Sequence, residues 1–187
     1  SFDTTYLSTL PNFIVMAASD EAELVRMINT STEINDRPCA FRYPRGTGLG
    51  SILPSINDKI EIGKSKIIKE GKKLAILNFG ARLNETLKAA DNLLKKGVSI
   101  TVVDARFAKP LDENLIWQLA TTHEAIMTIE EGSIGGFGSH VVDFLTKKGL
   151  MDSNLKFRSL TLPDIFIDQD TPCLLYTSDA ADEGGSG

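Results

Sequence analysis

Residues 74–103 read LAILNFGARLNETLKAADNLLKKGVSITVV, and this stretch decides the fold class. It opens with six mostly apolar residues, which is typical of a short strand buried on both faces. An amphipathic helix is predicted next, because apolar side chains recur at spacings of four and three at Leu83, Leu87, Ala90 and Leu94. A second apolar run closes the stretch at residues 98–103. Strand, helix and strand in this order predict a βαβ unit with parallel strands.

The same alternation continues toward the C-terminus. The pattern predicts a helix over residues 112–120, a strand over 125–130, a glycine-rich turn over 132–138, a helix over 139–147 and a strand over 155–160. Residues 60–69 are interpreted as an edge hairpin or an extended entry strand. We therefore expect an α/β domain over residues 60–172, with a doubly wound, mostly parallel sheet and helices on both faces.

A second βαβ unit is predicted upstream. Residues 12–17 (NFIVMA) are a buried strand, Ser19 is a good N-cap for a helix that ends near Asp36, and residues 39–43 are the next strand. A proline and three glycines then start a connector. We expect residues 1–46 to belong to one domain and residues 47–59 to be a linker to the domain at 60–172.

Composition excludes several classes of protein. Apolar residues make up 42% and charged residues 24% of the 187 residues, an ordinary balance for a globular protein. The net charge of -5 argues against a nucleic-acid or anionic-membrane partner. No apolar run approaches the roughly 18 residues that span a bilayer, and the chain does not open with a signal peptide. We expect a cytoplasmic protein. Two cysteines give neither a disulfide framework nor metal-ligand spacing.

The last 15 residues are expected to be foreign to the protein. Residues 173–183, CLLYTSDAADE, resemble the translation of a transposase-based sequencing adapter in one reading frame, and residues 184–187 would be read-through into a tag. Such segments are excluded from reasoning about the fold. The alternative is a natural tail of small residues. We expect that the natural sequence continued past Pro172 and that Cys173 is artefactual.

Arg45 is the candidate ligand-binding residue. It follows the strand at residues 39–43, and ligands of doubly wound sheets bind at the carboxyl ends of the strands. A guanidinium there can hold a phosphate through two parallel hydrogen bonds. From spacing alone, a solvated or ion-paired surface arginine is the favoured interpretation.

Four other features favour structural interpretations. The glycine-rich turn at 132–138 could bind an anion at the start of the following helix, but it lacks the dinucleotide-binding fingerprint, so structural packing or a subunit contact is favoured. Glu130 and Glu131 are neighbours on a strand and should point to opposite faces. His123 and His140 have no partner pattern for a metal or a nucleophile. Residues 104–112 (DARFAKPLD) are predicted to be a structural turn, in which Arg106 and Asp112 could pair.

Six segments together resemble one family, the 1-deoxy-D-xylulose-5-phosphate synthases, in order over nearly the whole chain up to residue 170. They read FDTTYLSTLPNFIVMAASDEAEL (2–24), PCAFRYPRG (38–46), LAILNFG (74–80), VVDARFAKPLDE (102–113), HEAIMTIEEGSIGGFGSHV (123–141) and LPDIFIDQ (162–169). The resemblance implies that residues 1–46 are the C-terminal part of a pyrimidine-binding domain and that residues 60–172 are a transketolase C-terminal-like domain.

The resemblance also implies the activity. These transferases condense pyruvate with D-glyceraldehyde 3-phosphate to 1-deoxy-D-xylulose 5-phosphate and release carbon dioxide, for isoprenoid precursor, thiamine and pyridoxal phosphate biosynthesis. They use thiamine diphosphate with magnesium and form homodimers. The resemblance implies that Arg45 contacts the phosphate of the aldehyde and that Arg42 supports the strand or an ion pair. It implies that the catalytic, cofactor-binding and metal-binding residues lie upstream of Ser1, so the chain alone is expected to be inactive.

Two alternatives stay open. The chain could be a piece resembling the beta subunit of a 2-oxo-acid dehydrogenase, which works with lipoyl carriers. It could also be a non-catalytic module used for assembly. The short βαβ unit at residues 1–46 argues against the second alternative, because a lone βαβ unit leaves apolar faces uncovered.

Overall fold

Five strands form the larger of two sheets in the computed structural model of the protein, which describes residues 2–44 and 46–165. The strand order is β3-β5-β4-β7-β8, with bounds β3 Lys66–Lys69, β4 Leu74–Phe79, β5 Ile100–Asp104, β7 Ala125–Glu130 and β8 Lys156–Leu160. The last four strands in this order run parallel, and β3 is antiparallel to β5 at the edge. The predicted mostly parallel sheet and its edge strand are confirmed.

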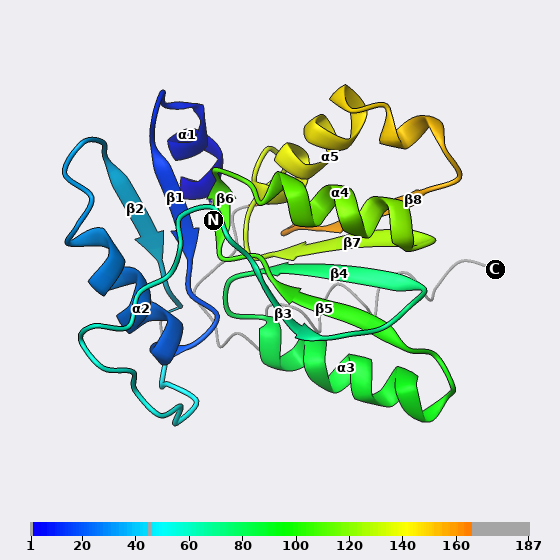
Figure 1. Ribbon diagram of the computed structural model, residues 1–187, viewed down its shortest axis with the longest axis horizontal. Helices are drawn as coiled ribbons and strands as arrows, with labels where there is room; N and C mark the ends of the chain where they lie inside the picture. The colour runs from blue at the N-terminus through cyan, green and yellow to red at the C-terminus, as the bar shows by residue number, and fades with distance from the viewer. Residues whose placement is uncertain (1, 45, 166–187) are drawn as a thin grey trace.

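Helices cover both faces of this sheet, as predicted. Figure 1 shows α3 (Leu83–Lys95) on one side and α4 (Glu113–Thr122) and α5 (Phe137–Lys147) on the other. A short 3-10 helix, η1 (Leu150–Asp152), leads from α5 to β8. None of the helices in the described part of the chain is long and apolar enough to cross a bilayer.

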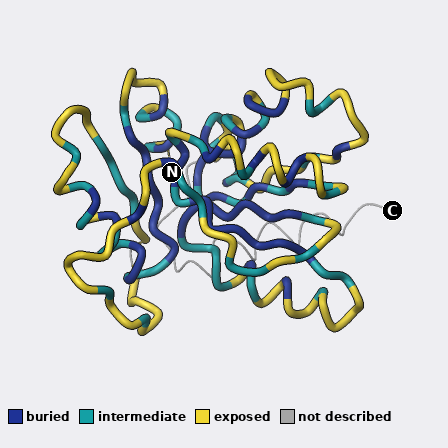
Figure 2. The backbone as a smooth tube through the Cα atoms, in the orientation of Figure 1, coloured by how far each residue is buried: buried dark blue, intermediate teal, exposed yellow. Residues whose placement is uncertain are grey.

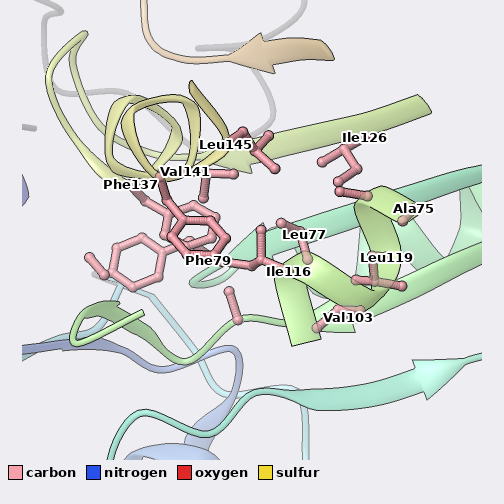
Figure 3. Packing of buried hydrophobic residues seen from close by; sticks show 14 of the residues in the cluster. Ala75, Leu77, Phe79, Val103, Ile116, Leu119, Ile126, Phe137, Val141 and Leu145 are labelled. Carbon is pink, nitrogen blue, oxygen red and sulfur yellow. The ribbon is translucent and has the colours of Figure 1, made fainter. Parts of the chain in front are cut away.

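The main core lies between the five-stranded sheet and the pair α4 and α5. Phe79 of β4 stacks on Phe137 of α5, with ring centroids 5.1 Å apart and planes 17° from parallel (Figure 3). Aliphatic side chains of both helices meet the strands around this pair, among them Ile116, Leu119, Val141 and Leu145. A smaller apolar cluster under α3 covers the other face. Both faces are covered, which is why β4 and β5 are apolar almost throughout instead of alternating.

A three-stranded sheet lies beside the larger one, in the order β2-β1-β6 (Figure 1). Its bounds are β1 Ile14–Ala17, β2 Cys39–Arg42 and β6 Phe107–Lys109, with α1 (Asp3–Thr9) and α2 (Glu21–Ser31) packed nearby. β1 and β2 are parallel, as predicted. β6 comes from the second part of the chain and pairs antiparallel with β1. The small core of this sheet contains Ile14, Met16, Ala18, Met27, Ile60 and Phe107.

Local details of the first βαβ unit differ from the prediction. The N-cap of α2 is Asp20 and not Ser19, because the Asp20 side chain accepts a hydrogen bond from the amide of Glu23 at 2.7 Å. The helix ends at Ser31 instead of near Asp36. Hydroxyl groups around its end bond to backbone carbonyls three or four residues earlier, a pattern that competes with further helix. α1 and β6 were not predicted, because both are too short for a periodic signal.

The predicted linker at residues 47–59 contains neither helix nor strand and is largely exposed (Figure 2). Its first part is fixed to the start of α2, where the Glu21 carboxylate accepts hydrogen bonds from the amides of Leu49, Gly50 and Ser51. The aliphatic side chains beyond this point face solvent, Ile52 most of all at 93%.

Candidate functional site

The two sheets meet through a polar contact at the carboxyl ends of β1 and β5. The Ser19 hydroxyl, just after β1, donates a hydrogen bond of 2.6 Å to Asp104 Oδ2, at the end of β5. The backbone amide of Arg106 donates to Asp104 Oδ1 at 3.2 Å, and the amide of Ala17 donates to the Arg106 carbonyl at 3.0 Å. Asp104 is only 1% exposed. A buried carboxylate therefore joins the ends of two strands from different sheets.

The environment of Asp104 changes its acidity. Burial raises its pKa to about 6 because it penalises the charged form, and the negative charge of Glu23 acts in the same direction. The hydrogen bond from Ser19 and the positive charge and amide of Arg106 act in the opposite direction and are outweighed. Asp104 thus titrates in a range where an ordinary aspartate is already ionised.

Arg106 connects the two sheets through its side chain and its backbone. Its Nη2 donates a hydrogen bond of 2.9 Å to Glu23 Oε1 on α2, and its Nε lies 2.8 Å from Glu23 Oε2 in the same ion pair. Arg26 adds a second positive charge, with Nη1 2.8 Å from Glu23 Oε1. The φ angle of Arg106 is 59°, and the amide of Phe107 donates to the carbonyl of Ala105. This tight turn sends the chain from β5 into β6.

The possible pair between Arg106 and Asp112 does not form, because each residue has another partner. Arg106 bonds to Glu23, as described. Asp112 is the N-cap of α4 and accepts hydrogen bonds from the amides of Leu115 at 3.2 Å and Ser65 at 2.9 Å. The predicted structural role of residues 104–112 is therefore correct, but the partners come from distant parts of the chain.

Arg42 is the centre of a second polar group, at the carboxyl end of β2. Its Nε lies 3.0 Å from Asp3 Oδ2 on α1, and its Nη1 donates to the Glu131 carbonyl at 2.7 Å. The Glu131 carboxylate in turn lies 2.7 Å from Arg82 Nε, just before α3. The expected ion pair of Arg42 is confirmed. It links the three-stranded sheet to the segment that follows β7.

The glycine-rich turn at residues 132–138 is filled by the protein itself. The Glu130 carboxylate, on a residue 2% exposed, accepts hydrogen bonds from the amides of Phe137 at 2.9 Å and Gly138 at 2.8 Å. Burial raises the pKa of Glu130, while the two amides and the positive charge of Arg42 oppose the rise. A side chain at Gly136 would collide with this carboxylate. The start of α5 thus holds an internal anion, which supports the predicted structural role.

The histidines do not meet at a common site. His123 follows α4, and its two ring nitrogens lie 2.8 Å from Thr101 Oγ1 and 2.9 Å from Thr122 Oγ1. His140 lies on α5, where burial and then the charge of Lys109 lower its pKa. Within the described residues, no group of three or more His, Cys, Asp or Glu side chains could hold a metal ion.

Arg45 lies outside the described residues, as do Cys173 and the adapter-like string at 173–183. The residues on both sides of Arg45 are exposed. Its role as a phosphate ligand therefore stays a prediction. Sequence reasoning missed the contact between Ser19 and Asp104. The available signal was that each is a polar residue at the end of a predicted buried strand, where the ends of strands converge.

The described part of the chain is a doubly wound α/β domain that is joined at the ends of its strands to a smaller, mixed three-stranded sheet. Residues 63–178 match the family described as "Transketolase, C-terminal domain", which is more than half of the chain. The chain belongs to this family. The family occurs in thiamine-diphosphate-dependent enzymes, in which a divalent metal accompanies the cofactor.

A solved structure with the same fold is a split-gene transketolase, described as an inactive beta4 tetramer. It is 28% identical in sequence, with a TM-score of 0.74, over 87% of this chain and 52% of that protein. The chain thus spans about half the length of the protein that it matches.

The described residues do not fit a thiamine diphosphate and magnesium site of their own. They offer no metal-binding group of side chains, and Glu130 takes up the amides at the start of α5 that could otherwise bind a diphosphate. The described contacts of Ser19 and Arg42 fasten the ends of β1 and β2 to the second part of the chain.

Proposed function

We propose that this chain is part of a 1-deoxy-D-xylulose-5-phosphate synthase. The enzyme would transfer a two-carbon unit from pyruvate, with loss of carbon dioxide, to the aldehyde carbon of D-glyceraldehyde 3-phosphate. Membership of the transketolase C-terminal family supports the class of enzyme. The six segments quoted above support the particular reaction. Thiamine diphosphate would supply the electron sink for the decarboxylation.

The observation that carries the proposal is the sequence RYPRG at residues 42–46, directly at the carboxyl end of β2. β2 is parallel to β1, and ligands of parallel sheets bind outside the carboxyl ends of the strands. In the proposed enzyme Arg45 binds the phosphate of D-glyceraldehyde 3-phosphate, because a guanidinium can offer two parallel hydrogen bonds to phosphate oxygens.

The proposal includes a division of the chain. Residues 1–46 would be the C-terminal part of a pyrimidine-binding domain, 47–59 a linker, 60–172 the transketolase C-terminal-like domain and 173–187 foreign sequence. Copies of the intact enzyme would associate as a homodimer, and the tetrameric description of the similar split-gene transketolase supports self-association. The chain alone would not turn over substrate, and thiamine-dependent decarboxylation of pyruvate by the isolated chain would contradict the proposal.

Substitution of Arg45 in the intact synthase tests the site. We expect Arg45→Ala to lower kcat/KM for D-glyceraldehyde 3-phosphate about 10- to 100-fold, the usual effect of losing a charged hydrogen-bond partner. The kcat/KM for unphosphorylated D-glyceraldehyde should change little. Arg37→Ala is the matched control, because Arg37 pairs with the adjacent Asp36 before β2 begins. Equal kinetics of the Arg45 variant and the wild type would remove the assignment.

The choice of acceptor separates this proposal from the dehydrogenase alternative. If the intact protein transfers its two-carbon unit to a lipoyl carrier and not to the phosphorylated aldehyde, it belongs to the 2-oxo-acid dehydrogenase group. Formation of 1-deoxy-D-xylulose 5-phosphate from the two substrates would support the synthase.

A further inference from the structure

We propose that Arg42 is a positioning residue that sets the specificity of the enzyme for a phosphorylated acceptor. The inference rests on the proposed function, in which Arg45 binds the acceptor phosphate. Arg42 would not touch the substrate. It would fix the end of β2, three residues before Arg45 in the sequence.

The contacts of Arg42 support this role, because both its backbone and its side chain are fixed. Its carbonyl accepts a hydrogen bond of 3.0 Å from the amide of Ala18, directly after β1. Its guanidinium bridges Asp3 on α1, at 3.0 Å, and the carbonyl of Glu131, at 2.7 Å. These partners come from three separate segments of the chain.

The far side of this bridge belongs to the segment between β7 and α5, next to the larger sheet. Glu131 is held by Arg82 at 2.7 Å, and its neighbour Glu130 is buried and bonded to two amides at the start of α5. The charge of Arg42 also acts on the Glu130 carboxylate. The end of β2 is therefore fastened to the larger sheet, while Tyr43 and Pro44 beyond it are exposed.

The spacer between Arg42 and Arg45 is short and stiff. Proline fixes its own φ angle near -65°, and it restricts the preceding residue, here Tyr43, to extended conformations. These restrictions limit the conformations of Tyr43 and Pro44, the two residues that separate the end of β2 from Arg45 in the sequence. Release of the Arg42 side chain should therefore misplace the residue that binds the phosphate, without removing any contact to the substrate.

The test is a mutant cycle in the intact synthase. The quantity measured is the ratio of kcat/KM for D-glyceraldehyde 3-phosphate to kcat/KM for D-glyceraldehyde. We expect Arg42→Ala to lower this ratio about tenfold, mainly through KM of the phosphorylated acceptor, because a misplaced binding group loses affinity and orientation. KM for pyruvate should not change. Arg42→Lys keeps the charge but loses the fork and should fall between the wild type and the alanine variant.

Two further variants keep the test decisive. Asp3→Asn removes one charged partner of Arg42 with little change in shape, and it should lower the ratio about threefold even if Arg42→Ala does not fold. In the Arg45→Ala background, Arg42→Ala should lower the ratio no further, since it acts through Arg45. Arg37→Ala is again the matched control and should leave the ratio unchanged.

Each result has a distinct meaning. A similar loss of activity with both acceptors on Arg42→Ala shows a structural role and overturns the inference, and so does an additive effect in the Arg45→Ala background. If Arg45→Ala lowers the ratio but Arg42→Ala and Asp3→Asn do not, the inference fails and the proposed phosphate site stands. If Arg45→Ala itself leaves the ratio unchanged, the proposed site fails and the inference fails with it.

Discussion

The five-stranded and three-stranded sheets are stabilised in different ways. The larger sheet has apolar clusters on both faces, and its strands β4 and β5 are almost wholly buried. In the smaller sheet β1 is buried but β2 is only half-buried, and the third strand comes from the second part of the chain. The larger sheet therefore takes most of its core from its own strands and helices, and the smaller one depends on it.

β1 shows how this dependence works. Its alternate residues Ile14 and Met16 belong to the small core, while Val15 and Ala17 belong to the main core. Its end is joined to β5 through Ser19 and Asp104. The smaller sheet is thus attached through the side chains of β1 that enter the main core and through buried polar contacts. The polar contacts are sensitive to charge in a way that the main core is not.

The largest expected effect comes from comparing the main core with the small core of the three-stranded sheet. Phe79→Ala removes a buried ring that stacks on Phe137, and we expect it to lower the free energy of unfolding by about 3–5 kcal/mol. Phe41→Ala makes the same chemical change on the half-buried strand β2 and should cost less than half as much. Urea unfolding of this chain measures both. Equal costs would show that the two sheets are stabilised alike.

A pH-dependent effect of intermediate size is expected at the contact between the sheets. The raised pKa of Asp104 means that the folded chain binds more protons than the unfolded chain between pH 3.8 and about 6. The contribution of Asp104 to stability is therefore complete below pH 3.8 and is lost as the pH rises through about 6. The rise in the pKa of Asp104 corresponds to a change of at most about 3 kcal/mol in the free energy of unfolding.

Asp104→Asn should remove this dependence, because an amide can still accept the hydrogen bond from Ser19 but does not ionise. Relative to the wild type, the variant should gain stability between pH 4 and pH 7, measured by urea unfolding at each pH. Asp143→Asn, at an exposed ion pair with Lys147, controls for the loss of one negative charge. A difference between variant and wild type that stays constant over this range would argue against the buried charge.

The smallest expected effect compares the helix caps of the two regions. Asp20→Ala removes the N-cap of α2 and an acceptor for the Ser51 hydroxyl, which can bond to water instead, and it should lower the free energy of unfolding by about 1 kcal/mol. Asp112→Ala removes the N-cap of α4 and also an acceptor for the amide of Ser65, so about 2 kcal/mol is expected. Thermal or urea unfolding can resolve the two. A larger loss of stability for Asp20→Ala than for Asp112→Ala would contradict the expected order of the two caps.

The elements with long periodic patterns could be predicted well from the sequence. The apolar runs of β4, β5 and β7 and the helical spacing of α3 are local signals, so their types followed directly. The cap of α2 was placed one residue early, because Ser19 and Asp20 are both good caps and only the contact of Ser19 with Asp104 decides between them. β6 has three residues and forms only because β1 offers an edge to pair with.

By itself the sequence determined the class of the fold, the parallel order of its units and the resemblance from which Arg45 was predicted. Periodicity, turn residues and motifs involve residues that are close in the sequence, so they can be recognised without a structure. Only the tertiary structure decided the partners of Asp104, Arg106 and Arg42. These contacts join residues more than 80 positions apart in several cases, and charge alone cannot choose among many possible partners until packing brings two of them together.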